Sequence, residues 1–390
     1  MLGPPLRHSH SALTVIRSRS NLRGQTMTGS NEILVEALQA ALPPLLRSLD
    51  VLSYIVRHMH PPRIPALIEK FGDEDGAVLR GVQALQGPVW PPHLQPVIKQ
   101  IEAVAGEVCK AFTGLRSVGQ TPNGMMEVYY ALRHATLAQE LLYPLASRIP
   151  MVSRFFLDEA QREDEALLAK LETGATRDNT GVMHSTNTTG DTRGGFSLFV
   201  PENYDETVNH PLIFALHGGS GHGRSFLWSW LRAARSRGAI LISPSSRGQT
   251  WALQGPDTDT PNLLSMLAYV RERWNVDERR ILLTGMSDGG TFTYISGLQG
   301  EQPYTHLAPV AASFHPLLLE FFPAERMKGL PIHITHGALD WMFPAANAQA
   351  MAAALQEFGA QVVYRQIANL SHTYPSNEEN TEVMNWFLTP

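Results

Sequence analysis

The chain has 390 residues, more than one domain usually needs, so two domains are expected. Hydrophobic residues make up 43% and charged residues 17%, as in ordinary globular proteins, and the net charge of -5 gives no electrostatic attraction to nucleic acid or an anionic membrane. The single cysteine, Cys109, excludes an intrachain disulfide, argues against a zinc–thiolate site and favours a reducing compartment, so we expect a cytoplasmic protein.

The first segment, residues 1–30, differs in composition from the rest of the chain. It contains no acidic residue, carries four arginines and is rich in serine, a composition resembling that of an organellar transit peptide. The alternative, which we favour, is that translation begins at Met27. In either case we expect the segment to be disordered and to take no part in chemistry.

Residues 31–175 carry the pattern of amphipathic helices. Apolar side chains recur at spacings of three and four residues, as at Leu34, Leu38, Leu42 and Leu45 and again at Val97, Ile101, Val104 and Val108. Proline pairs at 43–44, 61–62 and 91–92 are expected to limit or kink these helices. We therefore predict a bundle of about five helices, forming a domain whose role the sequence does not reveal.

From residue 195 onward, short apolar runs alternate with helical segments. The preceding stretch, residues 173–195, is rich in Gly, Thr and Asn and predicts a linker or a long turn. The predicted strands are residues 195–201, 211–218, 239–245, 279–286, 307–313, 331–337 and 361–367, and the predicted helices are residues 224–238, 262–276, 291–299, 346–360 and 378–388. This alternation indicates a doubly wound α/β domain over residues 185–390, with a mostly parallel sheet and its functional groups at the carboxyl ends of the strands.

The stretch "LLTGMSDGGTF", residues 282–292, places a serine among glycines directly after a predicted strand. It contains the G-x-S-x-G pattern around Ser287 and is followed by a predicted helix. A strand, a sharp turn and a helix are the setting of a nucleophile elbow, in which a serine is exposed at the top of the sheet. The alternative is that Ser287 only caps the start of the helix.

A serine nucleophile needs a base, and the base needs a carboxylate to orient it. Asp340 in "ITHGALDWMFP" follows one predicted strand, and His372 in "IANLSHTYP" follows the last. The order serine, acid, histidine is the order that this architecture imposes. His315 and His333 are the competing histidines: His315 follows a strand and could line a pocket, whereas His333 lies within a strand and is expected to be structural. His336 is expected to satisfy backbone groups near the acid.

The turn "FALHGGSGHGRS" follows the first central strand of the predicted sheet. Gly218 and Gly219 would let backbone N–H groups approach an anionic oxygen closely, and Asp288, directly after the nucleophile, would supply a second donor. These groups are our predicted oxyanion hole. A phosphate-binding loop is the weaker alternative, because no Lys-Ser or Lys-Thr follows the glycines.

Residues 185–390 resemble the α/β-hydrolase superfamily, and within it the serine esterases of the phospholipase/carboxylesterase, feruloyl esterase and polyhydroxyalkanoate-depolymerase type. The stretches that carry this resemblance are "LHGGSG", "VDERRILLTGMSDGG", "HGALDWMFP" and "LSHTYP". The resemblance implies the same nucleophile, acid and base, Ser287, Asp340 and His372, and the same oxyanion donors. It covers about half of the chain, and residues 1–180 show no family resemblance.

Hydrolysis of a small-molecule carboxylic ester through an acyl-enzyme is therefore the leading hypothesis, with no metal and no organic cofactor. Trp228, Trp251, His315 and Trp341 lie near strand ends and are predicted to bind substrate, although ordinary packing would equally place the tryptophans there. A peptidase or an acyltransferase using the same triad stays open, as does a non-catalytic interaction protein. No apolar stretch approaches the roughly 20 residues that would span a bilayer.

Overall fold

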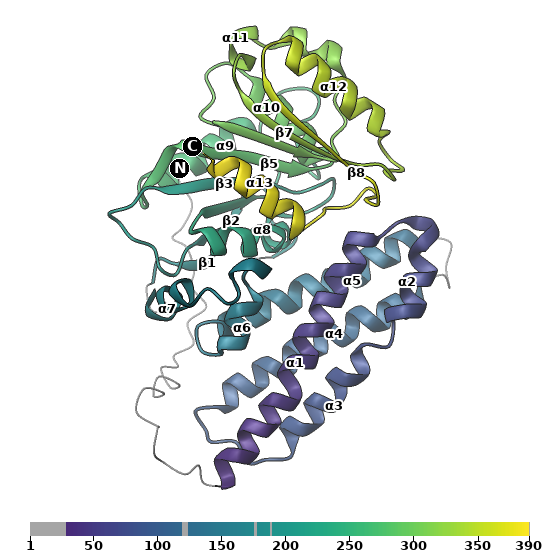
Figure 1. Cartoon of the computed structure of the whole chain (residues 1–390), viewed down its shortest axis with the longest axis vertical. Helices are drawn as coiled ribbons and strands as arrows, with labels where there is room; N and C mark the ends of the chain where they lie inside the picture. The colour runs from purple at the N-terminus through teal and green to yellow at the C-terminus, as the bar shows by residue number, and fades with distance from the viewer. Residues whose placement is uncertain (1–28, 119–123, 175–177, 188, 390) are drawn as a thin grey trace. The chain divides into compact units, whose positions relative to one another are not determined.

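The structure is a computed structural model that describes residues 29–118, 124–174, 178–187 and 189–389 (Figure 1). The prediction of disorder for residues 1–30 falls outside these ranges except at its end, where the first helix begins at Gly29. The chain divides into two compact units, and the division falls between Phe156 and Leu157. Each unit is described by itself.

The first unit is helical, as predicted. Its helices are α1 (Gly29–His58), α2 (Ile64–Phe71), α3 (Asp75–Gln86), α4 (Gln95–Ser117), α5 (Gly124–Leu142) and α6 (Pro150–Phe155), with short 3-10 turns at η1 (Pro61–Arg63) and η2 (Tyr143–Leu145). Small residues let two helix pairs approach closely. A Cβ built on Gly81 of α3 would lie 2.8 Å from the Cα of Ala41, and one on Gly114 of α4 would lie 2.8 Å from the Cβ of Ala131 on α5.

The proline pair at 43–44 does not end a helix, because α1 continues through both residues. Each proline removes one backbone hydrogen bond, yet the apolar face of α1 on either side of the pair is buried. Its buried side chains are Ala41, Leu42, Leu45, Leu46, Leu49 and Leu52. Packing of this face outweighs the lost hydrogen bonds, so the expectation that the pair ends a helix was wrong, whereas a kink stays a prediction.

The second unit contains one eight-stranded sheet (Figure 1). Its strands are β1 (Gly181–Ser185), β2 (Phe196–Val200), β3 (His210–Leu216), β4 (Ile240–Pro244), β5 (Val276–Met286), β6 (His306–Val310), β7 (Pro331–Gly337) and β8 (Gln361–Ile367). They lie in the order β1-β2-β4-β3-β5-β6-β7-β8. The strands from β4 to β8 in this order run parallel, whereas β2 is antiparallel to both β1 and β4. All seven predicted strands are confirmed.

Strand β1 was not predicted, because it lies within the stretch that the composition marked as a linker. Its five residues pair with β2, with Gly181 opposite Val200 and Ser185 opposite Phe196. Only Gly181 and Met183 of this strand are buried. An edge strand that buries so few side chains carries little apolar periodicity, so its pairing partner decides its conformation.

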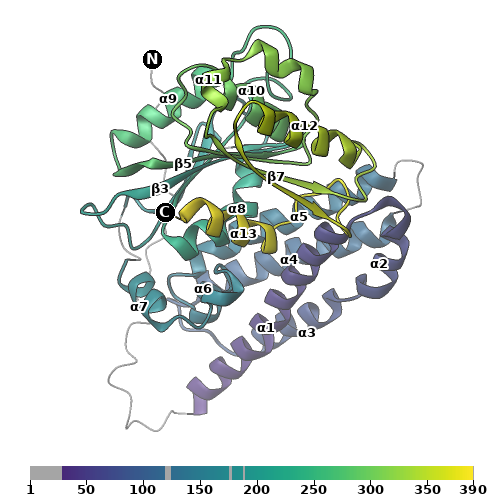
Figure 2. The same cartoon turned by 45° about the horizontal axis from the view of Figure 1, so that its top comes forward.

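Helices cover both faces of the sheet, as Figure 1 and Figure 2 show. Helices α8 (Gly223–Arg237) and α13 (Glu378–Leu388) lie on one face, and α9 (Thr260–Arg271), α10 (Asp288–Leu298) and α12 (Ala345–Glu357) lie on the other. Strand β3 shows how the faces are divided. Its Leu212, Phe214 and Leu216 join the core beneath α9, α10 and α12, whereas the alternate residues Ile213 and Ala215 are buried outside that core.

Helix α7 (Glu165–Gly174) belongs to the sheet-containing unit, although we expected it in the helical domain. The segment before it is tied to α8, because the Asp158 N–H donates to Ser236 Oγ at 2.8 Å and the Asp158 carboxylate forms an ion pair with Arg237. At the end of α7, a Cβ built on Gly174 would overlap the carbonyl oxygen of Glu202 at 2.0 Å. Because of these contacts, the boundary between the two units lies after residue 156, whereas the composition predicted it near residue 175.

Strands β3 and β5 are neighbours at the centre of the sheet, and the helices that follow them, α8 and α10, leave toward opposite faces. In open α/β sheets, ligands bind beyond the carboxyl ends of the strands at such a switch in direction. The predicted oxyanion turn and the predicted elbow begin at the carboxyl ends of β3 and β5. Within the described ranges, no helix has the length and hydrophobicity needed to cross a membrane.

Candidate active site

Ser287 lies at the sharp turn between β5 and α10. Its backbone has φ 54° and ψ -118°, a conformation that residues other than glycine rarely adopt. The Ser287 N–H donates to the carbonyl oxygen of Val310 at the end of β6, at 2.9 Å, and its own carbonyl accepts from the Thr291 N–H at 2.8 Å. The turn is thus held from both sides in the strained conformation that a nucleophile elbow requires.

The structure brings together the three side chains predicted to form a triad. The Nε2 atom of His372 lies 3.0 Å from Ser287 Oγ, and its Nδ1 atom lies 2.9 Å from Asp340 Oδ2. Because a carboxylate can only accept, Nδ1–H of His372 donates to Asp340 and Nε2 accepts from the Ser287 hydroxyl. Both Ser287 and His372 are buried, and the ring of Phe343 packs edge-on against His372 with the ring centroids 5.1 Å apart.

Asp340 lies in a turn that follows β7, and its side chain is fully buried. One carboxylate oxygen accepts from the N–H groups of Met342 and Phe343, at 2.9 and 2.8 Å. The other oxygen accepts from His372 and lies 3.2 Å from Nε2 of His336. Burial alone would raise the pKa of Asp340, but the hydrogen bonds from the two histidines and from the backbone outweigh it and hold the pKa well below its usual range.

The predicted oxyanion turn lies directly against the elbow. A Cβ built on Gly218 would lie 3.6 Å from the Cβ of Ser287, and one on Gly219 would lie 2.7 Å from Oδ2 of Asp288. Thr250 donates its hydroxyl to the same carboxylate oxygen at 2.5 Å. Asp288 is the first residue of α10, where the backbone N–H has no partner within the helix. The three predicted oxyanion residues therefore meet beside the nucleophile.

His217, which the sequence analysis did not single out, holds this turn in place. Its Nδ1 atom lies 2.7 Å from the carbonyl oxygen of Gly218, and its Nε2 atom accepts from the Ser246 N–H at 3.1 Å. A neutral imidazole with its proton on Nδ1 satisfies both bonds. Burial, reinforced by the nearby charge of Arg193, lowers the pKa of His217 to about 3 and keeps the ring neutral.

The hydrogen bond from His217 fixes the peptide group that joins Gly218 to Gly219. The Gly218 carbonyl also accepts from the Gly221 N–H at 3.0 Å, so two donors hold its direction. Because a trans peptide is planar, the Gly219 N–H points away from the side on which the carbonyl is held. The indole of Trp251 completes the arrangement by donating to the His217 carbonyl at 2.7 Å. The only sequence signal for His217 was its place directly before the glycine pair.

The four residues predicted to bind substrate occupy two kinds of position. Trp228 is buried in α8. Trp251 is buried behind the oxyanion turn, where its ring stacks on that of Phe292 with the ring centroids 5.3 Å apart. Trp341 and His315 are exposed, and Nδ1 of His315 accepts from the Leu317 N–H at the start of η4 (Pro316–Phe321). Contact between any of these residues and a substrate stays a prediction.

Two loops at the carboxyl edge of the sheet carry exposed apolar side chains. Leu317, Leu318 and Phe321 lie in η4 after β6, and Trp341 and Met342 directly follow Asp340. Phe321 is 82% exposed, an unusual position for so large an apolar ring. Both loops leave the same edge as the triad, so they present apolar surface on the side of the unit where the triad lies.

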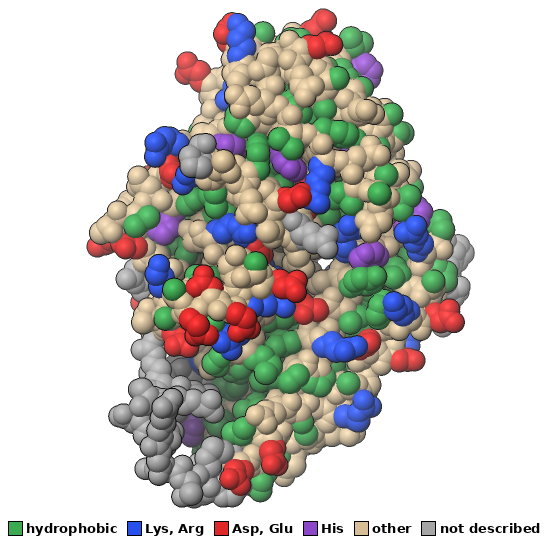
Figure 3. All heavy atoms as spheres, viewed as in Figure 1, with side chains coloured by type: hydrophobic (Ala, Val, Ile, Leu, Met, Phe, Trp, Pro, Cys, Tyr) green, Lys and Arg blue, Asp and Glu red, His purple; other side chains and the backbone are tan. Residues whose placement is uncertain are grey.

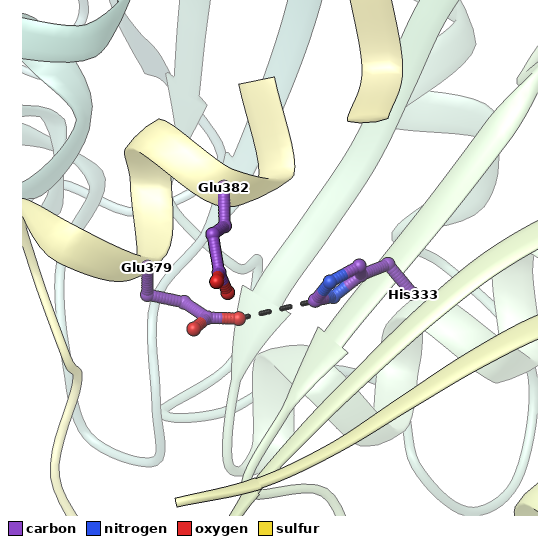
Figure 4. Close-up of side chains that lie close together, drawn as sticks. All are labelled: His333, Glu379 and Glu382. Carbon is purple, nitrogen blue, oxygen red and sulfur yellow. Dashed lines mark ion pairs between the residues drawn. The ribbon is translucent and has the colours of Figure 1, made fainter. Parts of the chain in front are cut away.

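Away from the triad, His333, Glu379 and Glu382 form a cluster of residue types that bind metals (Figure 4). The guanidinium of Arg365 forms ion pairs with both glutamates, and Thr335 donates to Glu379. The positive charge that a metal would contribute is therefore already supplied by Arg365, and the cluster is an ion-pair network.

On the face of the molecule in Figure 3, basic and acidic side chains are intermixed.

No protein-family model matches this chain. Its relatives include the bifunctional acetylxylan esterase/xylanase XynS20E of Neocallimastix patriciarum, 26% identical over 196 residues, which are 48% of this chain and 27% of that protein. Feruloyl esterase B of Thermothelomyces thermophilus is 32% identical over 117 residues, 27% of this chain and 39% of that protein. The matches thus span about two fifths or less of these relatives.

Among solved structures, the acetyl xylan esterase from Aspergillus awamori is similar to 53% of this chain and 99% of its own, with 15% identity and a TM-score of 0.43. The sequence relatives are esterases, in agreement with the serine esterase resemblance noted above. The strand order and the elbow after β5 confirm the predicted α/β-hydrolase fold for the second unit.

Proposed function

We propose that this protein is a serine hydrolase that cleaves a carboxylic ester through an acyl-enzyme intermediate. The observation that carries the proposal is the continuous chain of hydrogen bonds from Ser287 Oγ through His372 to Asp340. The likeness to proteins named as acetylxylan and feruloyl esterases favours an ester over an amide as the substrate. Besides these side chains and the backbone, the proposed chemistry uses only the ester and water.

In the first half of the reaction, Ser287 Oγ attacks the carbonyl carbon of the ester while Nε2 of His372 takes the hydroxyl proton. The N–H groups of Gly219 and Asp288 would donate to the oxyanion that forms, and Asp340 would stabilise the imidazolium. His372 then gives the proton to the alcohol oxygen as the carbon–oxygen bond breaks. The products of this half are the free alcohol and an acyl group on Ser287.

In the second half, His372 takes a proton from water while the water oxygen attacks the acyl carbon. The proton then passes back to Ser287 Oγ as its bond to the acyl carbon breaks, which releases the carboxylic acid and restores the starting state. Two steps of this kind predict a burst of alcohol release whenever the second half is the slower one.

The test compares Ser287→Ala with the wild type and with Ser225→Ala, a matched control at an exposed serine of α8. We expect Ser287→Ala to lose fluorophosphonate labelling and hydrolysis of p-nitrophenyl acetate, and Ser225→Ala to keep both. An amide substrate such as an aminoacyl p-nitroanilide should react far more slowly than the ester. Labelling of Ser287→Ala at the wild-type rate would rule out the proposal, and faster cleavage of the amide would make the protein a peptidase.

A further inference from the structure

Asp340 has a second histidine neighbour that the proposed reaction does not use. Its Oδ2 atom lies 2.9 Å from Nδ1 of His372 and 3.2 Å from Nε2 of His336. The same Nε2 atom of His336 lies 2.9 Å from the carbonyl oxygen of Phe343. Both neighbours are acceptors, so Nε2 of His336 carries a proton and shares it between them.

The other ring nitrogen of His336 settles the protonation state of the ring. His336 is fully buried at the end of β7, and its Nδ1 atom has no hydrogen-bond partner among the described residues. A proton on that atom would be buried and unsatisfied, at a cost that a neutral ring avoids. The geometry thus favours one state, the neutral imidazole with its proton on Nε2.

Among the residues that the structure describes, the titratable groups that face the carboxylate of Asp340 are His336, from β7, and His372, from the loop after β8. The first donates from Nε2 and takes no part in the proposed proton transfer. The second changes its charge during the proposed reaction. One carboxylate oxygen therefore divides its hydrogen-bonding capacity between a fixed donor and the catalytic base.

We propose that His336 is a positioning residue that acts through Asp340. Its Nε2–H holds the carboxylate and the Phe343 carbonyl in one arrangement, and it weakens the attraction between the carboxylate and the His372 imidazolium. The effect on turnover rests on the proposed function, whereas the effect on the titration of His372 does not. Without His336, the carboxylate would stabilise the charged form of His372 more strongly, so His372 would bind a proton at higher pH.

The first experiment uses the wild-type protein and needs no variant. Labelling histidines with 15N lets NMR distinguish a protonated from an unprotonated ring nitrogen. We expect His336 to keep its proton on Nε2, with Nδ1 unprotonated, across the range from about pH 6 to pH 8 in which an ordinary histidine titrates. A proton on Nδ1, or an imidazolium in this range, would overturn the proposal.

The second experiment follows the 15N titration of His372 in two variants of His336. Phenylalanine fills the space without a donor, and glutamine keeps a donor at a similar reach. We expect His336→Phe to raise the titration midpoint of His372 by about one pH unit, the size expected from losing one charge-assisted hydrogen bond. The acidic limb of the kcat/KM profile should move upward with it, and His336→Gln should stay close to the wild type.

The matched control is His333→Phe, which removes another buried imidazole from the same strand, β7, but one that contacts Glu379. It should leave the midpoint of His372 unchanged. If His336→Phe lowered turnover while the midpoint stayed at its wild-type value, His336 would be merely structural and the inference would fall. If the wild type hydrolysed no ester and bound no fluorophosphonate, the proposed function would fail, yet the titration would still decide the role of His336.

Discussion

The side chain that most determines the chemistry of this site is the carboxylate of Asp340. It is fully buried, and each of its oxygens accepts two hydrogen bonds, from the N–H groups of Met342 and Phe343 and from the rings of His336 and His372. A carboxylate with four donors stays ionised, as the lowered pKa of Asp340 indicates. It can therefore both select the tautomer of His372 and stabilise its charged form.

Replacing Asp340 with asparagine should show how much the charge contributes. We expect Asp340→Asn to lower kcat about 10³- to 10⁴-fold, because an amide neither holds the tautomer of His372 nor stabilises its imidazolium. Steady-state kinetics with p-nitrophenyl acetate would measure this. Asp277→Asn, at the opposite end of β5 from the elbow, should change kcat little. Wild-type kcat in Asp340→Asn would mean that another residue supplies the carboxylate.

His217 should make folding depend on pH. Its pKa is lowered from 6.5 to about 3 by burial and by the charge of Arg193, so the unfolded chain binds a proton below pH 6.5 that the folded chain does not. Above pH 6.5 His217 is neutral in both states and does not change the free energy of unfolding. As the pH falls from 6.5 toward 3, the unfolded chain alone takes up a proton, so the free energy of unfolding decreases. At pH 5 this residue alone should lower the free energy of unfolding by about 2 kcal/mol relative to pH 7.5.

Urea unfolding followed by tryptophan fluorescence at the two pH values would measure the change. His217→Asn keeps an amide that can donate to the Gly218 carbonyl but has no group that titrates in this range. The variant should therefore lose less stability between pH 7.5 and pH 5 than the wild type does. An equal loss in both proteins would mean that His217 is protonated in the folded state as well.

At the scale of elements, the packing of three backbones explains why glycines surround the serine. Gly289 lies where α10 leaves the elbow, and a Cβ built on it would lie 2.4 Å from the carbonyl oxygens of both Leu216 and His217. A Cβ on Gly285 would lie 2.5 Å from the backbone of Gly289. The end of β3, the end of β5 and the start of α10 are thus closer together than any side chain allows.

Gly289→Ala should therefore damage both stability and activity. Because the overlapping atoms belong to the backbone, the strand end and the oxyanion turn must shift, and we expect a loss of about 3 kcal/mol in the free energy of unfolding. Ester hydrolysis should fall with it. The matched control is Gly300→Ala, where a Cβ would have no atom within 4 Å, and it should change stability by less than about 0.5 kcal/mol. Equal behaviour of the two variants would contradict this account.

At the scale of the whole molecule, every residue of the proposed reaction lies in the second compact unit. The core beneath α9, α10 and α12 is also built from that unit alone. The boundary of the unit precedes α7, because Asp158 pairs with Arg237 and Gly174 packs against Glu202. A chain that begins at Leu157 retains these contacts.

Two truncated chains test the boundary. The chain 157–390 should unfold cooperatively and hydrolyse p-nitrophenyl acetate. The chain 178–390 leaves the largely covered guanidinium of Arg237 without its carboxylate, so its free energy of unfolding should be lower by about 2 kcal/mol or more. Urea unfolding of both chains would measure the difference. Equal stability would place the boundary near residue 175, as the composition suggested.

The sequence by itself determined the order and type of seven strands and five helices from residue 195 onward, and the three side chains that meet at the sheet edge. Strand and helix periods are local, and in a parallel sheet the residues after successive strands must emerge at one edge. Ser287, Asp340 and His372 could therefore be named without coordinates. His336 was expected to contact the backbone near the acid, and it contacts both the Phe343 carbonyl and the acid itself.

Only the tertiary structure decided how the remaining polar groups are paired. The bond from His217 to the Gly218 carbonyl and the bond from His336 to Asp340 depend on side-chain directions that no spacing encodes. The same holds for β1, whose conformation comes from pairing with β2, and for the boundary before α7, which rests on contacts between distant residues. Periodicity reports which side of an element is buried, whereas hydrogen-bond partners are set by the packing of elements against one another.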